Sequence, residues 1–79
     1  MSWQPVTEDD RLFVQKWEAE SISRRMVCAA VEAARAGQVA TAGDLVAHLA
    51  GTFKLELLEH DSGRLAAFAL DVMTCYGRG

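Results

Sequence analysis

The residues best suited to metal or nucleophile chemistry are two histidines, His48 and His60, and two cysteines, Cys28 and Cys75. Local zinc sites place ligand pairs about two to five residues apart, whereas these histidines are twelve residues apart and the cysteines lie in separate segments. Both cysteines have apolar neighbours, among which a thiol packs as a small hydrophobic group and its reactive thiolate is disfavoured. We therefore expect two reduced, buried thiols, no metal, no cofactor, no catalytic residue and no enzyme activity.

Tryptophan and arginine are the side chains enriched at the hot spots of protein–protein interfaces. The first half of the chain supplies them at Trp3, Trp17, Arg24, Arg25 and Arg35. A simpler interpretation stands beside this one, because Trp3 can fold back onto the chain's own core and adjacent arginines commonly lie on a solvated face. We take these residues as candidates for binding a protein partner.

The helical pattern that positions these side chains starts at Thr7, after a flexible leader over residues 1–6. Thr7 can cap a helix whose first turn is acidic, as the positive end of the helix dipole favours. The pattern stops at Gly37, a residue type that suits the position just beyond a helix end. The sequence therefore predicts helix over residues 7–36.

Two apolar faces within this stretch do not line up. Ile22 and Met26 share one face, while Phe13 and Trp17 lie roughly 140° away around an ideal helix. Either the helix breaks near residues 20–23, where serines can bond to the backbone and restart a helix, or it is continuous. In the continuous case Trp17 lies on the face of Arg24, Cys28 and Arg35. We favour the break.

A second helical stretch is expected over residues 41–60, with a kink at Gly51. Thr41 and Asp44 form a capping pattern ahead of an apolar run. Residues 53–58 begin with the alternation of a strand, but lysine, leucine and glutamate are strong helix formers and no partner strand is visible. We expect helix in this segment.

Residues 41–51 resemble the first helix and turn glycine of a helix-turn-helix. The resemblance implies a dimeric DNA-binding regulator with its motif around residues 41–59. Residues 52–59, however, offer one lysine and two glutamates where a recognition helix normally brings basic or amide side chains. The net charge of −3 also leaves no basic field for phosphates. We keep DNA binding as the alternative function and expect no nucleic-acid partner.

The most apolar segment is the last one, which is predicted as helix over residues 62–76. Its charged positions Arg64, Asp71 and Arg78 are seven residues apart, so they lie along one line that we expect to face water. The apolar surface covers roughly 200° of the circumference, about twice the stripe of an ordinary surface helix.

So broad an apolar surface needs neighbours on at least two sides. We expect this segment to be the central helix, with core and oligomer contacts made by Leu65, Phe68, Leu70, Val72, Met73 and Tyr76. The other stretches offer narrow, alanine-rich faces, so we expect a second copy or a partner to complete the fold.

A chain of 79 residues forms one domain, and a domain of this size buries only about 60% of its unfolded surface. No apolar stretch reaches the roughly 18 residues of a membrane span, and no signal-peptide pattern opens the chain, so we expect a cytoplasmic protein without a membrane partner. The sequence predicts an all-α bundle of three or four helices. Its expected function is that of a non-enzymatic interaction module (adaptor, inhibitor or regulatory subunit) that binds itself or another protein through helix-presented apolar surface.

Overall fold

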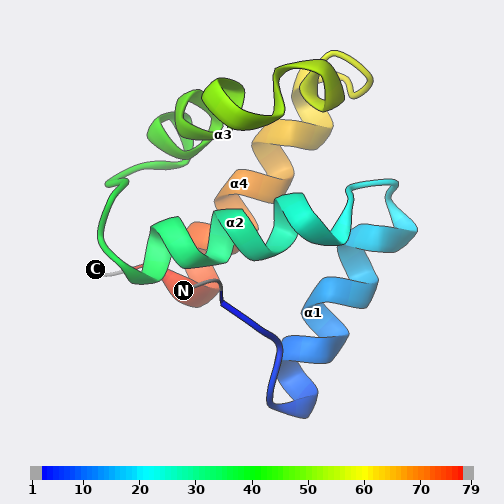
Figure 1. Ribbon diagram of the computed structural model, residues 1–79, viewed down its shortest axis with the longest axis vertical. Coiled ribbons are helices and arrows are strands. Elements are labelled where there is room, and N and C mark those ends of the chain that lie inside the picture. Colours follow the sequence, from blue (N-terminus) through cyan, green and yellow to red (C-terminus); the bar gives the residue numbers. More distant parts are fainter. Residues whose placement is uncertain (1–2, 78–79) are drawn as a thin grey trace.

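The computed structural model describes residues 3–77, which form four α-helices and no strand (Figure 1). These helices are α1 (Glu8–Ala19), α2 (Arg24–Arg35), α3 (Ala42–Leu57) and α4 (Ser62–Tyr76). The predicted all-α bundle is therefore confirmed, with four helices. The first two residues of the predicted leader, and Arg78 of the predicted charged line, lie outside the described residues.

A capping side chain precedes each helix, at Thr7, Ser23, Thr41 and Asp61. Each accepts a hydrogen bond from the backbone N–H three residues later, which satisfies a donor that the helix itself leaves free. At Thr7 the bond is reciprocal, because the Asp10 carboxylate accepts from the Thr7 N–H at 3.4 Å. These caps set where the four helices begin.

The chain changes direction between α1 and α2 through a tight hydrogen-bonded turn. The N–H of Ser21 donates to the carbonyl of Glu18, and the N–H of Ile22 donates to the carbonyl of Trp17, both at 3.0 Å. This is the Schellman arrangement, which requires a left-handed residue just beyond the helix end. Ser21 supplies it with a φ of 69°, where Gly37 does the same after α2 with a φ of 73°. Residues 7–36 thus form two helices rather than one.

The kink in α3 lies at Phe53 rather than at Gly51. Phe53 has φ −118° and ψ 33°, and it is the one non-helical residue inside this helix. Its ring packs against the core, and the Arg25 guanidinium lies over it at 5.8 Å from the ring centroid. Gly51 is exposed with open space around it, so tertiary packing of the aromatic side chain, not glycine freedom, accounts for the bend.

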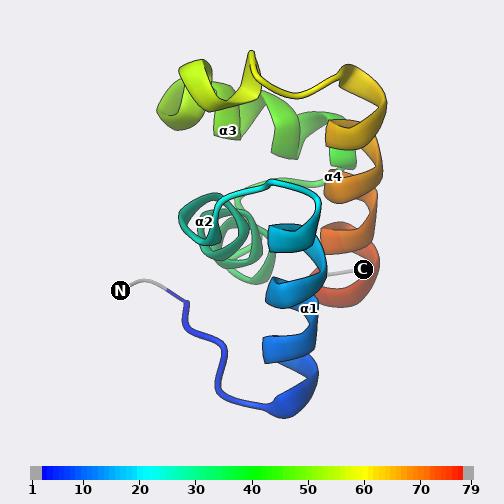
Figure 2. The same ribbon diagram turned by 90° about the vertical axis from the view of Figure 1, so that its right-hand side faces the viewer.

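The most enclosed helix is α2, not α4. Its buried residues are Met26, Val27, Cys28, Ala30, Val31, Ala33 and Ala34, whereas those of α4 are Phe68, Ala69 and Val72. Helix α2 packs against all three other helices, and Figure 2 shows α4 along one edge of the molecule. Our expectation that residues 62–76 form the central helix is wrong, because the small alanines of α2 let its neighbours approach from several sides.

One apolar core joins the four helices. It includes Phe13 and Trp17 of α1, Leu45 of α3 and Phe68 of α4, all packed around α2. Among residues 3–77, no polar or charged residue is buried. Within the same range, none of the helices has the length and apolar character needed to span a membrane.

Candidate interaction surface

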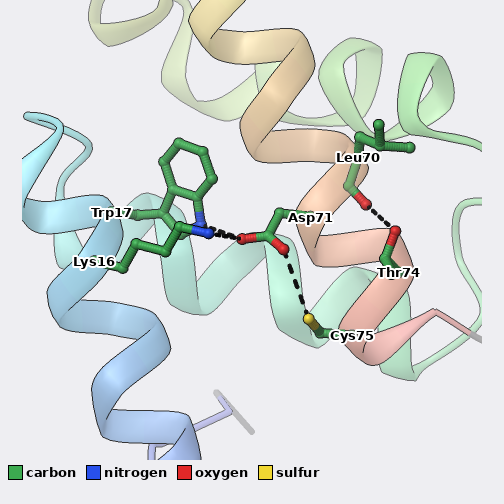
Figure 3. Close-up of polar contacts among 6 residues, drawn as sticks. All are labelled: Lys16, Trp17, Leu70, Asp71, Thr74 and Cys75. Atoms are coloured by element: carbon green, nitrogen blue, oxygen red, sulfur yellow. Dashed lines mark hydrogen bonds and ion pairs between the residues drawn. The ribbon is translucent and has the colours of Figure 1, made fainter.

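The charged line of α4 faces α1 instead of water. The Asp71 carboxylate accepts a hydrogen bond from Trp17 Nε1 at 2.9 Å and pairs with Lys16 Nζ at 3.0 Å (Figure 3). The Asp71 side chain is only 23% exposed. Our expectation that Asp71 lies in water is wrong, because the turn after α1 brings that helix back against this side of α4.

Two further contacts extend this arrangement along both helices. Arg64 Nε lies 3.7 Å from Glu20 Oε2, and the Tyr76 hydroxyl donates to Asp10 Oδ1 at 2.8 Å. The partners follow one another in opposite chain directions, so α1 and α4 lie antiparallel here. We call these contacts, together with those of Asp71, the α1–α4 seam.

Both carboxylates of the seam that accept hydrogen bonds favour the ionised state. Partial burial alone would raise the pKa of Asp71, but the hydrogen bonds from Lys16 and Trp17 and the Lys16 charge lower it overall. Desolvation alone would likewise raise the pKa of Asp10, but the hydrogen bonds donated by Tyr76 and Thr7 lower it overall. Burial, followed by the bond to Asp10, raises the pKa of Tyr76. At Asp71 and Asp10 the seam therefore pairs neutral or cationic donors with ionised carboxylates.

Neither tryptophan lies free on the surface. Trp17 is 6% exposed, and its ring meets Phe68 edge-to-face with centroids 5.2 Å apart. Trp17 is thus a core residue of this fold, and Asp71 satisfies its indole N–H. Trp3 is partly buried and meets Tyr76 edge-to-face at 5.5 Å, so the leader folds back onto the end of α4.

The three predicted arginines are all exposed but do not form one cluster. Arg24 and Arg25 line a groove of about 350 Å³ with Glu32 and Phe53 among the other lining residues. Arg35 lies at the opposite end of α2. The groove mixes both signs of charge, and its arginine side chains are solvated.

The predicted contact residues of α4 divide into two groups. Phe68 and Val72 are fully buried, and the partly buried residues that pack against the core beside them are Leu65, Met73 and Tyr76. Leu70 is 61% exposed. It is therefore not a core residue, because the neighbours of α4 lie on the other sides of that helix.

The exposed side of α4 carries no charge. Its exposed residues are Ser62, Gly63, Ala66, Ala67, Leu70, Thr74 and Cys75. At about 100° per residue, five of these fall within an arc of roughly 100°, and we call them the outer strip: Gly63, Ala66, Ala67, Leu70 and Thr74. The Thr74 hydroxyl donates to the Leu70 carbonyl at 2.8 Å (Figure 3), so its polar group is already satisfied within the helix.

Sequence reasoning found Leu70 but missed the rest of the outer strip. The available signal was the absence of charge at Ala66, Ala67 and Thr74, on the side of the helix that the line of Arg64 and Asp71 leaves open. Our prediction assigned Leu70 to core and oligomer contacts without separating the two. Next to it, α1 and α4 leave a depression of about 320 Å³ whose lining includes Lys16 and Leu70.

The two thiols differ in exposure, and both are free. Cys28 is buried, but Cys75 is exposed, so the prediction of two buried thiols is wrong for Cys75. Burial raises the pKa of Cys28, and burial together with the Asp71 charge raises that of Cys75. Within the part of the chain that the structure describes, no three His, Cys, Asp or Glu side chains are grouped to hold a metal ion.

Residues 41–59 form no separate recognition helix. Beyond the kink at Phe53, α3 continues only through Lys54–Leu57. The Glu56 carboxylate in this short arm is engaged by the Ser23 hydroxyl at 2.7 Å. The geometry therefore offers little support for reading DNA with this segment.

The outer strip is thus one uncharged surface that the described part of the fold leaves without a neighbour, and exposed leucines also lie elsewhere, at Leu12, Leu55 and Leu58. Comparison of the chain with protein-family models, with curated proteins and with solved structures finds no match.

Proposed function

We propose that the chain is a non-enzymatic protein–protein interaction module that pairs with a second copy of itself through the outer strip of α4. The observation that carries this proposal is the uncharged exposed face of α4, in a chain whose residues are 24% charged. Leu70, 61% exposed at the middle of that face, supplies the apolar anchor. Adaptors, inhibitors and regulatory subunits are functions that such a module would serve.

A second copy suits this surface better than a charged partner would. In an antiparallel pair centred on Leu70, Ala66 and Ala67 of one copy lie opposite Thr74 of the other. The small side chains let two helices approach closely, so that Leu70 packs against its symmetry mate. Because the strip is uncharged, the twofold axis brings no like charges together.

The substitution Leu70→Asp tests this pairing. Leu70 is exposed, so the variant should fold as the wild type does, while two buried carboxylates at the twofold axis should abolish association. Light scattering at micromolar concentration should give a dimer mass for the wild type and a monomer mass for the variant. Circular dichroism should be the same for both.

Leu55→Asp is the matched control. Leu55 is 80% exposed on α3, and its substitution makes the same chemical change away from the outer strip. It should leave the dimer intact. A wild type that is monomeric at these concentrations, or a loss of association in both variants, would contradict the proposed pairing.

The compartment is part of the same proposal. We place the module in the cytoplasm, because free thiols such as Cys28 and Cys75 suit a reducing environment.

A further inference from the structure

We propose that α1 exchanges between two copies of this chain. The hinge, defined as residues 20–23 between α1 and α2, would straighten so that the two helices become one. Each α1 would then occupy, on the other copy, the position it holds in the single chain. This inference goes beyond the pairing of outer strips and does not depend on it.

The hinge holds a residue in a conformation that its side chain disfavours. Ser21 has a φ of 69°, in the left-handed region where a Cβ collides with the following carbonyl. The equivalent turn after α2 uses Gly37, which has no Cβ. Between Thr7 and Ala36 there is no glycine or proline, so no residue in the hinge prevents the helix from continuing. Straightening relieves this strain in both chains.

A continuous helix would present two apolar faces to two different molecules. Ile22 and Met26, 1% and 0% exposed, are four residues apart, so a continued helix keeps them on the same face, against their own core. Phe13 and Trp17 would lie roughly 140–180° away around that helix, directed toward the second copy. The misaligned faces of residues 7–36 then fit a straight helix shared between two cores.

The contacts of α1 are preserved in the exchanged form. In the single chain Trp17 Nε1 and Lys16 Nζ lie 2.9 and 3.0 Å from Asp71, and Asp10 accepts from Tyr76. An identical chain offers the same partners, so exchange keeps the seam contacts of Asp71 and Asp10. Glu20, which gives up its exposed pairing with Arg64, comes four residues before Arg24 in the straight helix, an orientation that favours an ion pair.

Covalent trapping of Lys16 to Asp71 identifies the exchanged form directly. The full chain is refolded from denaturant at several hundred micromolar, dimer and monomer are separated, and each is treated with a carbodiimide. The carbodiimide adds to the Asp71 carboxylate to give an O-acylisourea, and the Lys16 amine attacks its acyl carbon, which forms the amide and expels the urea. In an exchanged dimer this amide joins two chains, so a denaturing gel shows a covalent dimer and peptide mass spectrometry finds the Lys16–Asp71 link.

Lys16→Arg is the control for the cross-link, because arginine keeps the charge but forms no amide with this reagent. It should abolish the covalent dimer while leaving the dimer in solution. A dimer whose Lys16–Asp71 link stays within one chain overturns the exchange and is the outcome that pairing by outer strips alone would give. A wild type that refolds only to monomer overturns it as well.

Two substitutions at Ser21 test whether strain in the hinge drives the exchange of α1. Ser21→Gly removes the collision in the closed form and should raise the dissociation constant of the exchanged dimer at least tenfold. Ser21→Ala disfavours the left-handed turn and favours helix, so it should lower that constant. Both are made alongside Leu70→Asp, which removes dimers that pair through the outer strip. Equal exchanged fractions in the two Ser21 variants would overturn the role of the hinge.

Discussion

Asp71 joins α4 to α1 through two donors at once. Its carboxylate is shared by an indole N–H and an ammonium group, at 2.9 and 3.0 Å. The indole belongs to a core residue, Trp17, so Asp71 supplies the acceptor that lets a polar ring atom lie inside a small apolar fold. The sequence showed an isolated acid on an apolar helix, but its partners lie 54 and 55 residues away along the chain.

Asp71→Asn should make the protein less stable at neutral pH and less sensitive to acid. The pKa of Asp71 is lowered in the folded chain, so its contribution is complete above the unfolded value near 3.9 and is lost as pH falls through the folded value. Asparagine keeps an acceptor but loses the charge, which should cost about 1 kcal/mol at pH 7. Between about pH 5 and pH 2, its free energy of unfolding should fall less steeply than that of the wild type.

Denaturant titrations at several pH values, followed by circular dichroism, measure this difference. The remaining slope of the variant includes Asp10, whose pKa is also lowered. Parallel pH profiles for the two proteins would show that Asp71 has the same pKa folded and unfolded.

At the scale of elements, the first turn of α2 carries positive charge where the helix dipole favours anions, and a carboxylate of α3 supplies the missing negative charge. Its first turn contains Arg24 and Arg25 and no acid, although the positive end of a helix dipole favours anions. The Glu56 carboxylate accepts from the Ser23 hydroxyl at 2.7 Å and from the Ser23 N–H at 3.2 Å. The cap of one helix is thus held by the side chain of another.

Glu56→Gln should therefore destabilise the fold by about 1 kcal/mol, through the loss of a charge-assisted contact at the dipole. Thermal unfolding followed by circular dichroism would detect it as a lower midpoint. Glu59→Gln is the matched control, because Glu59 is exposed and its side chain forms no hydrogen bond among the described residues. Equal midpoints for both variants would rule out this role for Glu56.

For the whole molecule, the question is how a chain of 79 residues closes a core. Phe68 is 0% exposed and meets Trp17 edge-to-face, so the two helices joined by the seam also share an aromatic contact in the core. Total stability for a chain of this length is roughly 4–12 kcal/mol. The free energy contributed by burying one large core side chain is a large part of that total.

Phe68→Ala should remove about 3–5 kcal/mol of the free energy of unfolding, while Leu70→Ala, two residues along the same helix, should change it by less than about 0.5 kcal/mol. Chemical denaturation at sub-micromolar concentration, where association does not contribute, measures both. Similar losses in the two variants would show that Leu70 is part of the core after all.

The sequence predicted where the helices begin and end better than it predicted which helices pack against one another. Caps and hydrophobic spacing mark the helices, and the mismatch between Trp17 and Ile22 marks the turn between α1 and α2. Which helix is enclosed depends instead on how closely others approach it. Three alanines of α2 are buried, namely Ala30, Ala33 and Ala34, whereas Ala66 and Ala67 of α4 are exposed, and nothing in the residue type separates the two cases.

The chain's two tryptophans both lie in the part that precedes the hinge. Trp17 has its ring in the core and its N–H on a carboxylate, while Trp3 is partly buried against Tyr76. Intrinsic tryptophan fluorescence therefore reports the docking of α1 and of Trp3, whichever copy they dock on. It should change little when α3 alone unfolds, because α3 contains no tryptophan. A time-resolved optical signal can thus separate release of α1 from unfolding of the remaining three helices, without any label.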